Sequence, residues 1–362
     1  MRDKGAEVLV MTRVDDLGGA LKREGFTVIP WHIKRGSLNP FREIYALVQV
    51  FAAYRRTRPD LVHHIALKPI VYGGFAALLC RDVPSVNTVA GLGHVFTSES
   101  RRMHVLRRVL LNLFRRVLKR KSAITAFQNI ENRDFLVEAG VVSEEQAVVI
   151  RGSGVNVREF VPRPEPKGIP VVVMASRMLW EKGVGEFVAA AKIMRGQGVS
   201  ARFVIVGESD AANPASIPEA QLLVWEKSGT VEWWRLRNDM PEVFAQSNLF
   251  CYPSYYGEGV PRVLIEAAAC GRAIVTADVP GCRDVVHDGY NGLLVPARNA
   301  EALAHALDTL LKDPVLRAHM GARGREIAVQ DFSEELVIEK TLAVYRELLG
   351  PRWPGAFATA FP

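Results

Sequence analysis

The sequence predicts an α/β protein built from two doubly wound, Rossmann-like domains that face a cleft. Short runs rich in β-branched residues alternate with helical patterns along most of its 362 residues, and this alternation is typical of parallel sheets covered by helices on both faces. A proline-rich stretch at 160–170 interrupts the alternation, which then starts again. A chain of this length usually forms two domains of comparable size, so the boundary is expected inside that stretch.

The first domain is expected over 1–165 and the second over 166–332, and a final helix over 333–350 is expected to pack back on the first domain. Strands of the first half are predicted at 6–11, 26–30, 60–65, 85–90, 123–128 and 147–152, with helices at 41–58 and 72–80. Strands of the second half are predicted at 171–176, 202–208, 249–254 and 273–278, with helices near 183–196, 241–246 and 261–270.

The beginning of the chain departs from this pattern. The first ten residues are typical of the end of a helix that leads directly into a strand. A doubly wound domain normally opens with a strand and a glycine-rich turn into its first helix. We therefore expect the usual first strand, its glycine-rich loop and most of the first helix to be missing.

The charge balance and the cysteines restrict the functional classes. Lys and Arg number 46 against 39 Asp and Glu, a net charge of +7, which favours acidic partners such as nucleotides, phosphates or an anionic membrane. The four cysteines contain no Cys-x-x-Cys pair, so we expect free thiols and a cytoplasmic location. No run of 18 apolar residues is present, so no membrane-spanning helix is predicted.

One glycine-rich stretch carries the first specific signal. Residues 254–271, SYYGEGVPRVLIEAAACG, place Glu258 in a tight turn and Glu266 inside the helix that follows. Pro261 suits the start of that helix, and the unpaired N–H groups of a helix start attract anions. Two carboxylates beside such an anion site predict a ligand with hydroxyl groups and a phosphate. The alternative is a capped core helix with two solvated glutamates.

A second stretch, ASRMLWEKGVGEFVAAA at 175–191, follows a strand and enters a helix. It places Arg177 and Lys182 near the carboxyl edge of the sheet, where doubly wound domains bind their ligands. Two cations there can neutralise a diphosphate, Arg177 through a forked contact and Lys182 as a point charge. A pair of solvated loop cations is the alternative.

Together these stretches resemble the family 4 retaining glycosyltransferases of the GT-B fold. The resemblance covers about residues 5–349 and is strongest in SRMLWEKG, FVIVGE and the long stretch that begins MPEVFAQSNLFCYPSYYGEG. Glu258 and Glu266 match the E-x7-E motif of that family. NTVAGLGHVFTS and FQNIENRDFLVEAG in the first half fit the same group. Within the family, the chain resembles most the bacterial enzymes that extend polyprenyl-diphosphate-linked glycans.

The resemblance implies a role for each matching side chain. It implies that Glu266 binds the ribose hydroxyls of a nucleotide and that Glu258 contacts the transferred sugar near the reaction centre. Arg177 and Lys182 are implied to bind the diphosphate, whose charge grows as the glycosidic bond breaks. Preplaced cations stabilise such a developing charge.

Backbone groups and the absence of a metal motif complete the expected donor site. N–H groups around Gly259 and Val260 are expected to hold sugar hydroxyls and phosphate oxygens. The sequence contains no D-x-D carboxylate pair at this site, so we expect no metal and no cofactor, with the nucleotide sugar as a substrate. The family is assigned front-side attack, in which the leaving phosphate helps to deprotonate the acceptor.

The acceptor side is expected in the first half, around Gly91, Gly93 and His94. An alanine stands before these residues where many members of the family carry a histidine. A packed or surface position for His94 is the alternative to a place in the cleft. His63 and His64 end another strand, and because strand neighbours point to opposite faces, we expect one of them to face the cleft.

Residues 101–121 form a basic stretch, RRMHVLRRVLLNLFRRVLKRK, with apolar residues at helical spacing. A basic amphipathic helix can lie on anionic lipid, and a lipid-linked acceptor would bring the enzyme to a membrane. We therefore expect peripheral binding to the inner face of the membrane through this helix, and no nucleic-acid partner. The alternative is a core-facing helix with a solvated basic face.

The predicted function is a metal-independent retaining glycosyltransferase. It would move a hexose or N-acetylhexosamine from a nucleotide sugar, with UDP as the expected nucleotide, to a lipid-linked or polysaccharide acceptor in surface glycan biosynthesis. Two alternatives remain: a nucleotide-sugar epimerase of the same two-domain architecture, and a non-catalytic nucleotide-sugar-binding module. An epimerase would need no membrane-facing basic helix, and the expected loss of the opening segment keeps the binding module open.

Overall fold

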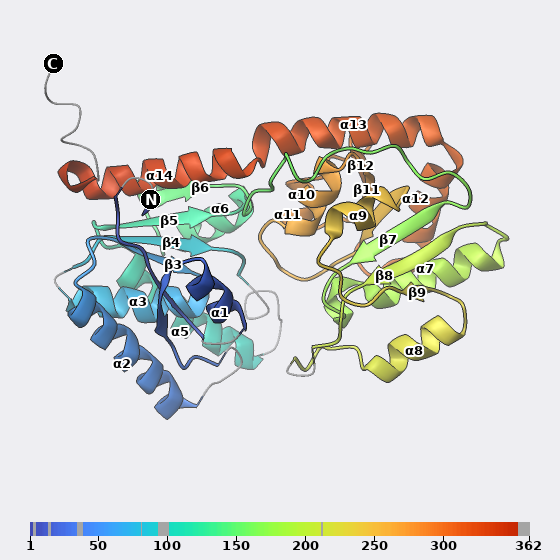
Figure 1. Cartoon of the computed structure of the whole chain (residues 1–362). Coiled ribbons are helices and arrows are strands. Elements are labelled where there is room, and N and C mark those ends of the chain that lie inside the picture. The colour runs from blue at the N-terminus through green and yellow to red at the C-terminus, as the bar shows by residue number, and fades with distance from the viewer. Residues whose placement is uncertain are drawn as a thin grey trace, which may run out of the picture.

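Two α/β lobes lie side by side, and two long helices run along one edge of both (Figure 1). This computed structural model describes residues 1–2, 5–13, 16–34, 39–80, 82–92, 101–210 and 213–353. The two-lobed arrangement of parallel sheets confirms the predicted fold class.

The C-terminal lobe contains a six-stranded parallel sheet in the order β12-β11-β10-β7-β8-β9. Its strands are β7 (Val171–Ala175), β8 (Arg202–Val206), β9 (Glu232–Trp233), β10 (Leu249–Tyr252), β11 (Ala273–Ala277) and β12 (Gly292–Val295). Its helices are α7 (Val184–Gly196), α8 (Glu219–Lys227), α9 (Met240–Ala245), α10 (Arg262–Ala269), α11 (Pro280–Arg283), α12 (Ala300–Lys312) and α13 (Pro314–Asp331). Strands β9 and β12 lie outside the predicted strand positions.

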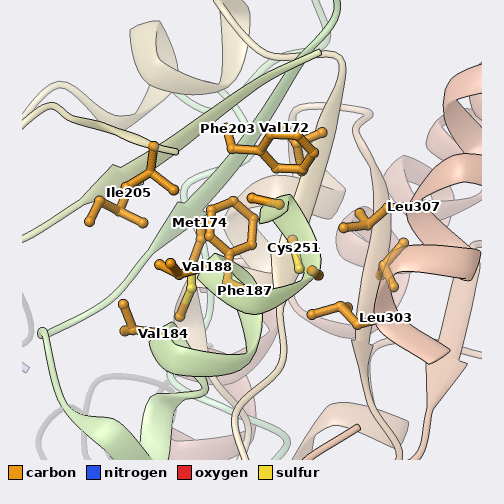
Figure 2. Packing of buried hydrophobic residues seen from close by; sticks show 14 of the residues in the cluster. Val172, Met174, Val184, Phe187, Val188, Phe203, Ile205, Cys251, Leu303 and Leu307 are labelled. Atoms are coloured by element: carbon orange, nitrogen blue, oxygen red, sulfur yellow. The ribbon is translucent and has the colours of Figure 1, made fainter. Parts of the chain in front are cut away.

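Apolar side chains cover both faces of this sheet. On one face, Figure 2 shows Met174 of β7 and Phe203 of β8 packed with Phe187 of α7. Leu303 and Leu307 of α12 complete that cluster. The strands are nearly continuous runs of buried Val, Ile, Phe and Ala because helices exclude water from both faces.

The strands of the N-terminal lobe hydrogen-bond as two separate parallel sheets, β1-β2 and β3-β4-β5-β6. These strands are β1 (Leu9–Thr12), β2 (Thr27–Pro30), β3 (Val62–Ile65), β4 (Ser85–Val89), β5 (Ala123–Phe127) and β6 (Ala147–Val149). The described helices are α1 (Asp16–Arg23), α2 (Pro40–Thr57), α3 (Leu67–Leu79), α5 (Arg101–Leu118) and α6 (Ile130–Glu138). Helix α1 connects β1 to β2, so the chain opens with a β-α-β unit.

The last helix, α14 (Glu334–Leu349), continues from α13 and crosses to the N-terminal lobe. Val344 on this helix packs with Val86 of β4 and Ile124 of β5. Ser333, just before α14, bridges to Val155. The end of the chain therefore ties the two lobes together.

Candidate active site

The order of strands in the C-terminal sheet reverses between β7 and β10. These two strands are neighbours in the sheet although they are far apart in the sequence. From β7 the chain continues to β8 on one side, and from β10 it continues to β11 on the other. Doubly wound sheets bind ligands in the crevice outside the carboxyl ends of the strands at such a point. The two sequence stretches with candidate residues follow β7 and β10 directly.

Lys182 and Glu258 meet in this crevice although 76 positions separate them. The Lys182 Nζ lies 2.5 Å from Glu258 Oε1 and donates to Tyr252 Oη at 3.0 Å. Tyr252 in turn donates to the same glutamate oxygen at 2.7 Å, and Ser254 Oγ lies 3.3 Å from it. Lys182 is only 5% exposed, so its charge acts in a poorly solvated place.

A glycine allows the loop after β7 to approach the loop after β10 this closely. Gly183 has φ +77°, and a Cβ at that position would stand 2.2 Å from the carbonyl oxygen of Pro253. Only glycine fits both the left-handed backbone and the close contact. The short η3 turn (Trp180–Lys182) therefore ends where Lys182 can reach the β10 loop.

Arg177 and Glu266 line a second part of the crevice, a pocket of about 420 Å³ bordered by the ends of β7 and β8. Arg177 Nη1 lies 3.3 Å from Asp210 Oδ2, and about half of the arginine side chain is exposed. Arg262 Nε donates to Glu266 Oε1 at 2.8 Å from one turn earlier in α10. Burial raises the pKa of Glu266, and the Arg262 charge opposes that rise.

The N-terminal lobe touches the glycine-rich turn at its base. Gly259 N–H donates to the carbonyl of Ala90, the residue after β4, at 2.9 Å. A Cβ on Gly91 would stand 2.8 Å from the Gly259 nitrogen. A second contact between the lobes joins Arg283 Nη2 to Glu131 Oε1 at 3.0 Å. The crevice is thus closed on one side by the carboxyl edge of the N-terminal sheet.

Two family models match this chain, and both describe glycosyltransferases. The model described as "Glycosyl transferases group 1" matches residues 157–327, and the one described as "Glycosyl transferase 4-like" matches residues 1–129. Both halves of the chain therefore match glycosyltransferase models. The predicted family resemblance is confirmed, and so is glycosyltransferase as the class of enzyme.

Two relatives match most of the chain. An N,N'-diacetylbacillosaminyl-diphospho-undecaprenol alpha-1,3-N-acetylgalactosaminyltransferase from Campylobacter jejuni is 28% identical, over 96% of this chain and 93% of its own. A UDP-Gal:alpha-D-GlcNAc-diphosphoundecaprenol alpha-1,3-galactosyltransferase from Escherichia coli is 23% identical, over 86% and 82%. The crystal structure of Anabaena HepE in complex with UDP superposes with a TM-score of 0.76 and 20% identity, over 95% and 93%.

Some predicted residues fall elsewhere than expected. Gly93 and His94 lie outside the described residues. The expectation that His63 or His64 faces the cleft is wrong, because protein groups already occupy their ring nitrogens. His64 contacts Asn87 Oδ1 at 2.7 Å and Tyr54 Oη at 2.6 Å. His63 contacts Thr88 Oγ1 at 2.7 Å and the Oη of a tyrosine on α14 at 2.5 Å.

Sequence reasoning missed two groups of the crevice. Tyr252 reads as one more apolar residue of a buried strand, but its hydroxyl joins Lys182 to Glu258. Asp210 pairs with Arg177 from the loop after β8. Both follow or end a strand at the carboxyl edge of the sheet. That position is the signal that could have identified them.

The basic helix is partly structural. Phe114, Val117 and Leu118 of α5 are buried, while Arg108 and Arg116 are exposed. Just beyond the helix, Arg120 is 8% exposed and bonds Asp82, the Val83 carbonyl and two serines. The inward-facing Arg120 therefore does not belong to the solvated basic face. Among the described helices, none is long and apolar enough to cross a membrane.

A larger cavity, of about 640 Å³, lies at the opposite end of the N-terminal sheet. Residues before β4 and β5 line it, together with Lys121, Glu145 and Arg352. None of the candidate donor or acceptor residues that the structure describes lines this cavity. The smaller pocket at the carboxyl ends of β7 and β8 is the better candidate because it gathers Arg177 and Glu266 at the switch point.

Proposed function

We propose that this chain transfers a hexose or N-acetylhexosamine from a nucleotide sugar, with UDP as the nucleotide, to a polyprenyl-diphosphate-linked glycan. The observation that carries the proposal is that two pairs lie at the carboxyl edge of the C-terminal sheet: Lys182 contacts Glu258, and Arg177 and Glu266 line one pocket. The names of two full-length relatives support the acceptor class, since both act on diphospho-undecaprenol-linked sugars. A lipid-linked acceptor places the reaction in surface glycan biosynthesis.

The proposed donor site uses the two cations in different ways. Lys182 is buried, so its charge acts on a departing diphosphate with little screening by water. Arg177 is half-exposed beside Asp210, and a surface pair of this kind contributes little to stability, so the guanidinium can exchange that carboxylate for a phosphate. Glu266, at the inner wall of the same pocket, accepts hydrogen bonds from the ribose hydroxyls.

The turn before α10 is proposed to hold the transferred sugar. Glu258 contacts the sugar through the carboxylate oxygen that is free of Lys182. Val260 and the first N–H groups of α10 face phosphate oxygens. The Gly259 N–H is bonded to Ala90 in this structure, so its role toward the donor requires release of that interlobe contact. The acceptor enters from the side of Gly91.

The proposed reaction retains the anomeric configuration and needs no metal ion. The bond from the anomeric carbon to the diphosphate oxygen breaks, the acceptor oxygen attacks from the same side, and its proton passes to the leaving phosphate. Lys182 and Arg177 neutralise the charge that develops.

The test of this proposal is a transfer assay with UDP-hexoses and UDP-N-acetylhexosamines, a polyprenyl-diphosphate-linked glycan and EDTA. We expect an elongated lipid-linked product whose new linkage has the anomeric configuration of the donor by NMR. A product of inverted configuration, or a strict need for a divalent ion, would contradict the mechanism. An epimerised nucleotide sugar without any elongated acceptor would establish the epimerase alternative.

The exposed arginines of α5 are proposed to hold the enzyme on an anionic membrane. Each basic residue near such a surface contributes about 1 kcal/mol, and the effect fades within a Debye length. We expect sedimentation with vesicles that contain phosphatidylglycerol, little with pure phosphatidylcholine, and release by high salt. Arg108→Glu with Arg116→Glu should weaken sedimentation strongly. Lys192→Glu with Lys227→Glu, an equal charge change at exposed positions of the C-terminal lobe, should not.

A further inference from the structure

Helix α2 presents an apolar stripe to solvent. Phe41 is 82% exposed, Ile44 58%, Tyr45 55% and Val48 53%. Their spacing places all four on one side of the first two turns. The opposite side of the helix is buried through alanine and valine residues that pack on the lobe. The four residues of the stripe are therefore not needed to pack this helix on the lobe.

The stripe lies at the cleft edge of the N-terminal lobe. Glu43, in the first turn of α2, accepts a hydrogen bond from Lys68 Nζ at 2.9 Å and another from the Tyr72 hydroxyl. Lys68 opens α3, directly after the carboxyl end of β3. The neighbouring strand β4 runs parallel and ends at the Ala90 contact with the glycine-rich turn. The first turns of α2 and the crevice thus share one edge of the lobe.

Positive charges surround the stripe. Arg42 is exposed beside it, and Arg55 and Arg56 are exposed in the last turn of α2. Helix α3 packs against both α2 and α5, so the basic helix α5 belongs to the same group of packed helices as the stripe. A second copy of this chain would place like charges against one another. An anionic lipid surface complements both the apolar and the basic residues.

We propose that Phe41, Ile44, Tyr45 and Val48 insert into the interfacial layer of an anionic bilayer and turn the crevice toward it. This inference rests on the proposed lipid-linked acceptor. The diphosphate and sugars of such an acceptor stand at the membrane surface while its tail stays among the lipid chains. An apolar stripe at the crevice edge brings the reactive end of the acceptor to the donor site. The basic residues attract the protein to the anionic membrane, and the inserted stripe sets the orientation of the crevice relative to the membrane surface.

The experiment measures binding of the full chain to vesicles of equal parts phosphatidylcholine and phosphatidylglycerol over a series of salt concentrations. Phe41→Ser with Ile44→Ser should weaken binding by about tenfold at every salt concentration, because two apolar side chains no longer leave water. The salt dependence itself should stay unchanged, since no charge is removed. The arginine variants of α5 should instead flatten the salt dependence.

The matched control is Val224→Ser with Ile338→Ser, which removes two apolar side chains from exposed positions on α8 and α14. It should bind vesicles like the unmodified protein. Equal binding by the α2 variant and the unmodified protein would overturn the inference. So would a dimer in analytical ultracentrifugation that Phe41→Ser converts to a monomer, because the stripe would then cover a second copy. No donor or acceptor is present, so the result is independent of the transfer assay.

Discussion

The two lobes share a sheet-and-helix architecture but differ in what their sheets bury. In the C-terminal lobe, β7 and β10 are fully buried and almost entirely apolar. In the N-terminal lobe, β4 and β5 bury Ser85, Asn87 and Thr125. The Asn87 Nδ2 and Thr125 Oγ1 atoms have no protein partner. A buried polar group without a partner is costly, so we expect the N-terminal sheet to be the less stable of the two, although the helical side of the C-terminal lobe also holds unpaired atoms, Asp284 Oδ2 and Asp308 Oδ1.

This difference fits the division of labour that we propose. In the C-terminal lobe, which we propose to hold the donor, Lys182 and Glu258 pair in the loops that follow β7 and β10 of a continuous six-stranded sheet, and a rigid support favours the fixed geometry that chemistry needs. The N-terminal lobe divides into two sheets and exposes apolar and basic helices. We expect rigidly placed side chains where bonds break. We expect more adaptable surfaces where the protein binds a large acceptor and a membrane.

The largest effect is expected at the buried cation. Lys182→Ala should lower turnover by about a hundredfold to a thousandfold, the usual cost of removing one preorganised group that stabilises developing charge. The melting temperature should change much less than activity, because water can reach the Glu258 carboxylate, which is 24% exposed. Steady-state kinetics and calorimetry measure the two quantities. Lys192→Ala, at an exposed position of α7, should leave both unchanged; parallel losses in the Lys182 variant would indicate a structural role.

Glu266→Ala should weaken binding of the free nucleotide by about tenfold to a hundredfold. The removed carboxylate would have accepted hydrogen bonds from the ribose, and hydrogen bonds to charged groups contribute about 1.5–3 kcal/mol. Isothermal titration with UDP measures the change. Glu339→Ala, at an exposed position of α14, serves as the control. An unaltered affinity in the Glu266 variant would remove this residue from the donor site.

Tyr252→Phe tests whether the hydroxyl between Lys182 and Glu258 positions them. Loss of one hydrogen bond of about 1 kcal/mol should lower turnover about fivefold, with little change in the Michaelis constant for the donor. Because burial raises the pKa of this tyrosine well above its usual range, the hydroxyl stays protonated and the effect should not vary between pH 6 and 9. Equal turnover in the two proteins would leave Tyr252 with a packing role only.

The smallest effect at neutral pH concerns the stability of the lobes. Burial lowers the pKa of His63 and His64 from 6.5 to about 4, so their contribution is present above pH 6.5 and is lost as the pH falls toward 4. In the C-terminal lobe, burial raises the pKa of Asp284 from 3.8 to about 6, which gives the opposite dependence. Hydrogen exchange at pH 7 and pH 5 should show the N-terminal lobe losing protection first. If the C-terminal lobe lost protection first, the N-terminal lobe would not be the less stable of the two at low pH.

The sequence predicted all six described strands of the N-terminal lobe but only four of the six strands in the C-terminal sheet. A buried strand is recognised in a sequence by its run of β-branched residues. Strand β9 has only two residues and β12 begins with Gly292, so neither shows such a run. The E-x7-E spacing identified Glu258 and Glu266 as candidates. Spacing could not show that Lys182 pairs with Glu258, because that contact depends on the close approach at Gly183.

In the N-terminal lobe the missing information was tertiary. The sequence of β3 allows either histidine to face the cleft, and only the packing of α2 and α14 decides that both are satisfied internally. The basic run likewise gives no sign that Arg120 turns inward to Asp82. In the sequence, the apolar residues of α2 resemble an ordinary core-facing pattern, and only the packing shows that the stripe faces solvent.

The division of labour between the lobes is tested most directly by steady-state kinetics with both substrates varied, on vesicles that contain the lipid-linked acceptor. Glu266→Ala should raise the Michaelis constant for the nucleotide sugar and leave that for the acceptor unchanged. The double variant Phe41→Ser with Ile44→Ser should raise the constant for the acceptor only. If either variant changes both constants equally, or changes the one assigned to the other lobe, the account is contradicted.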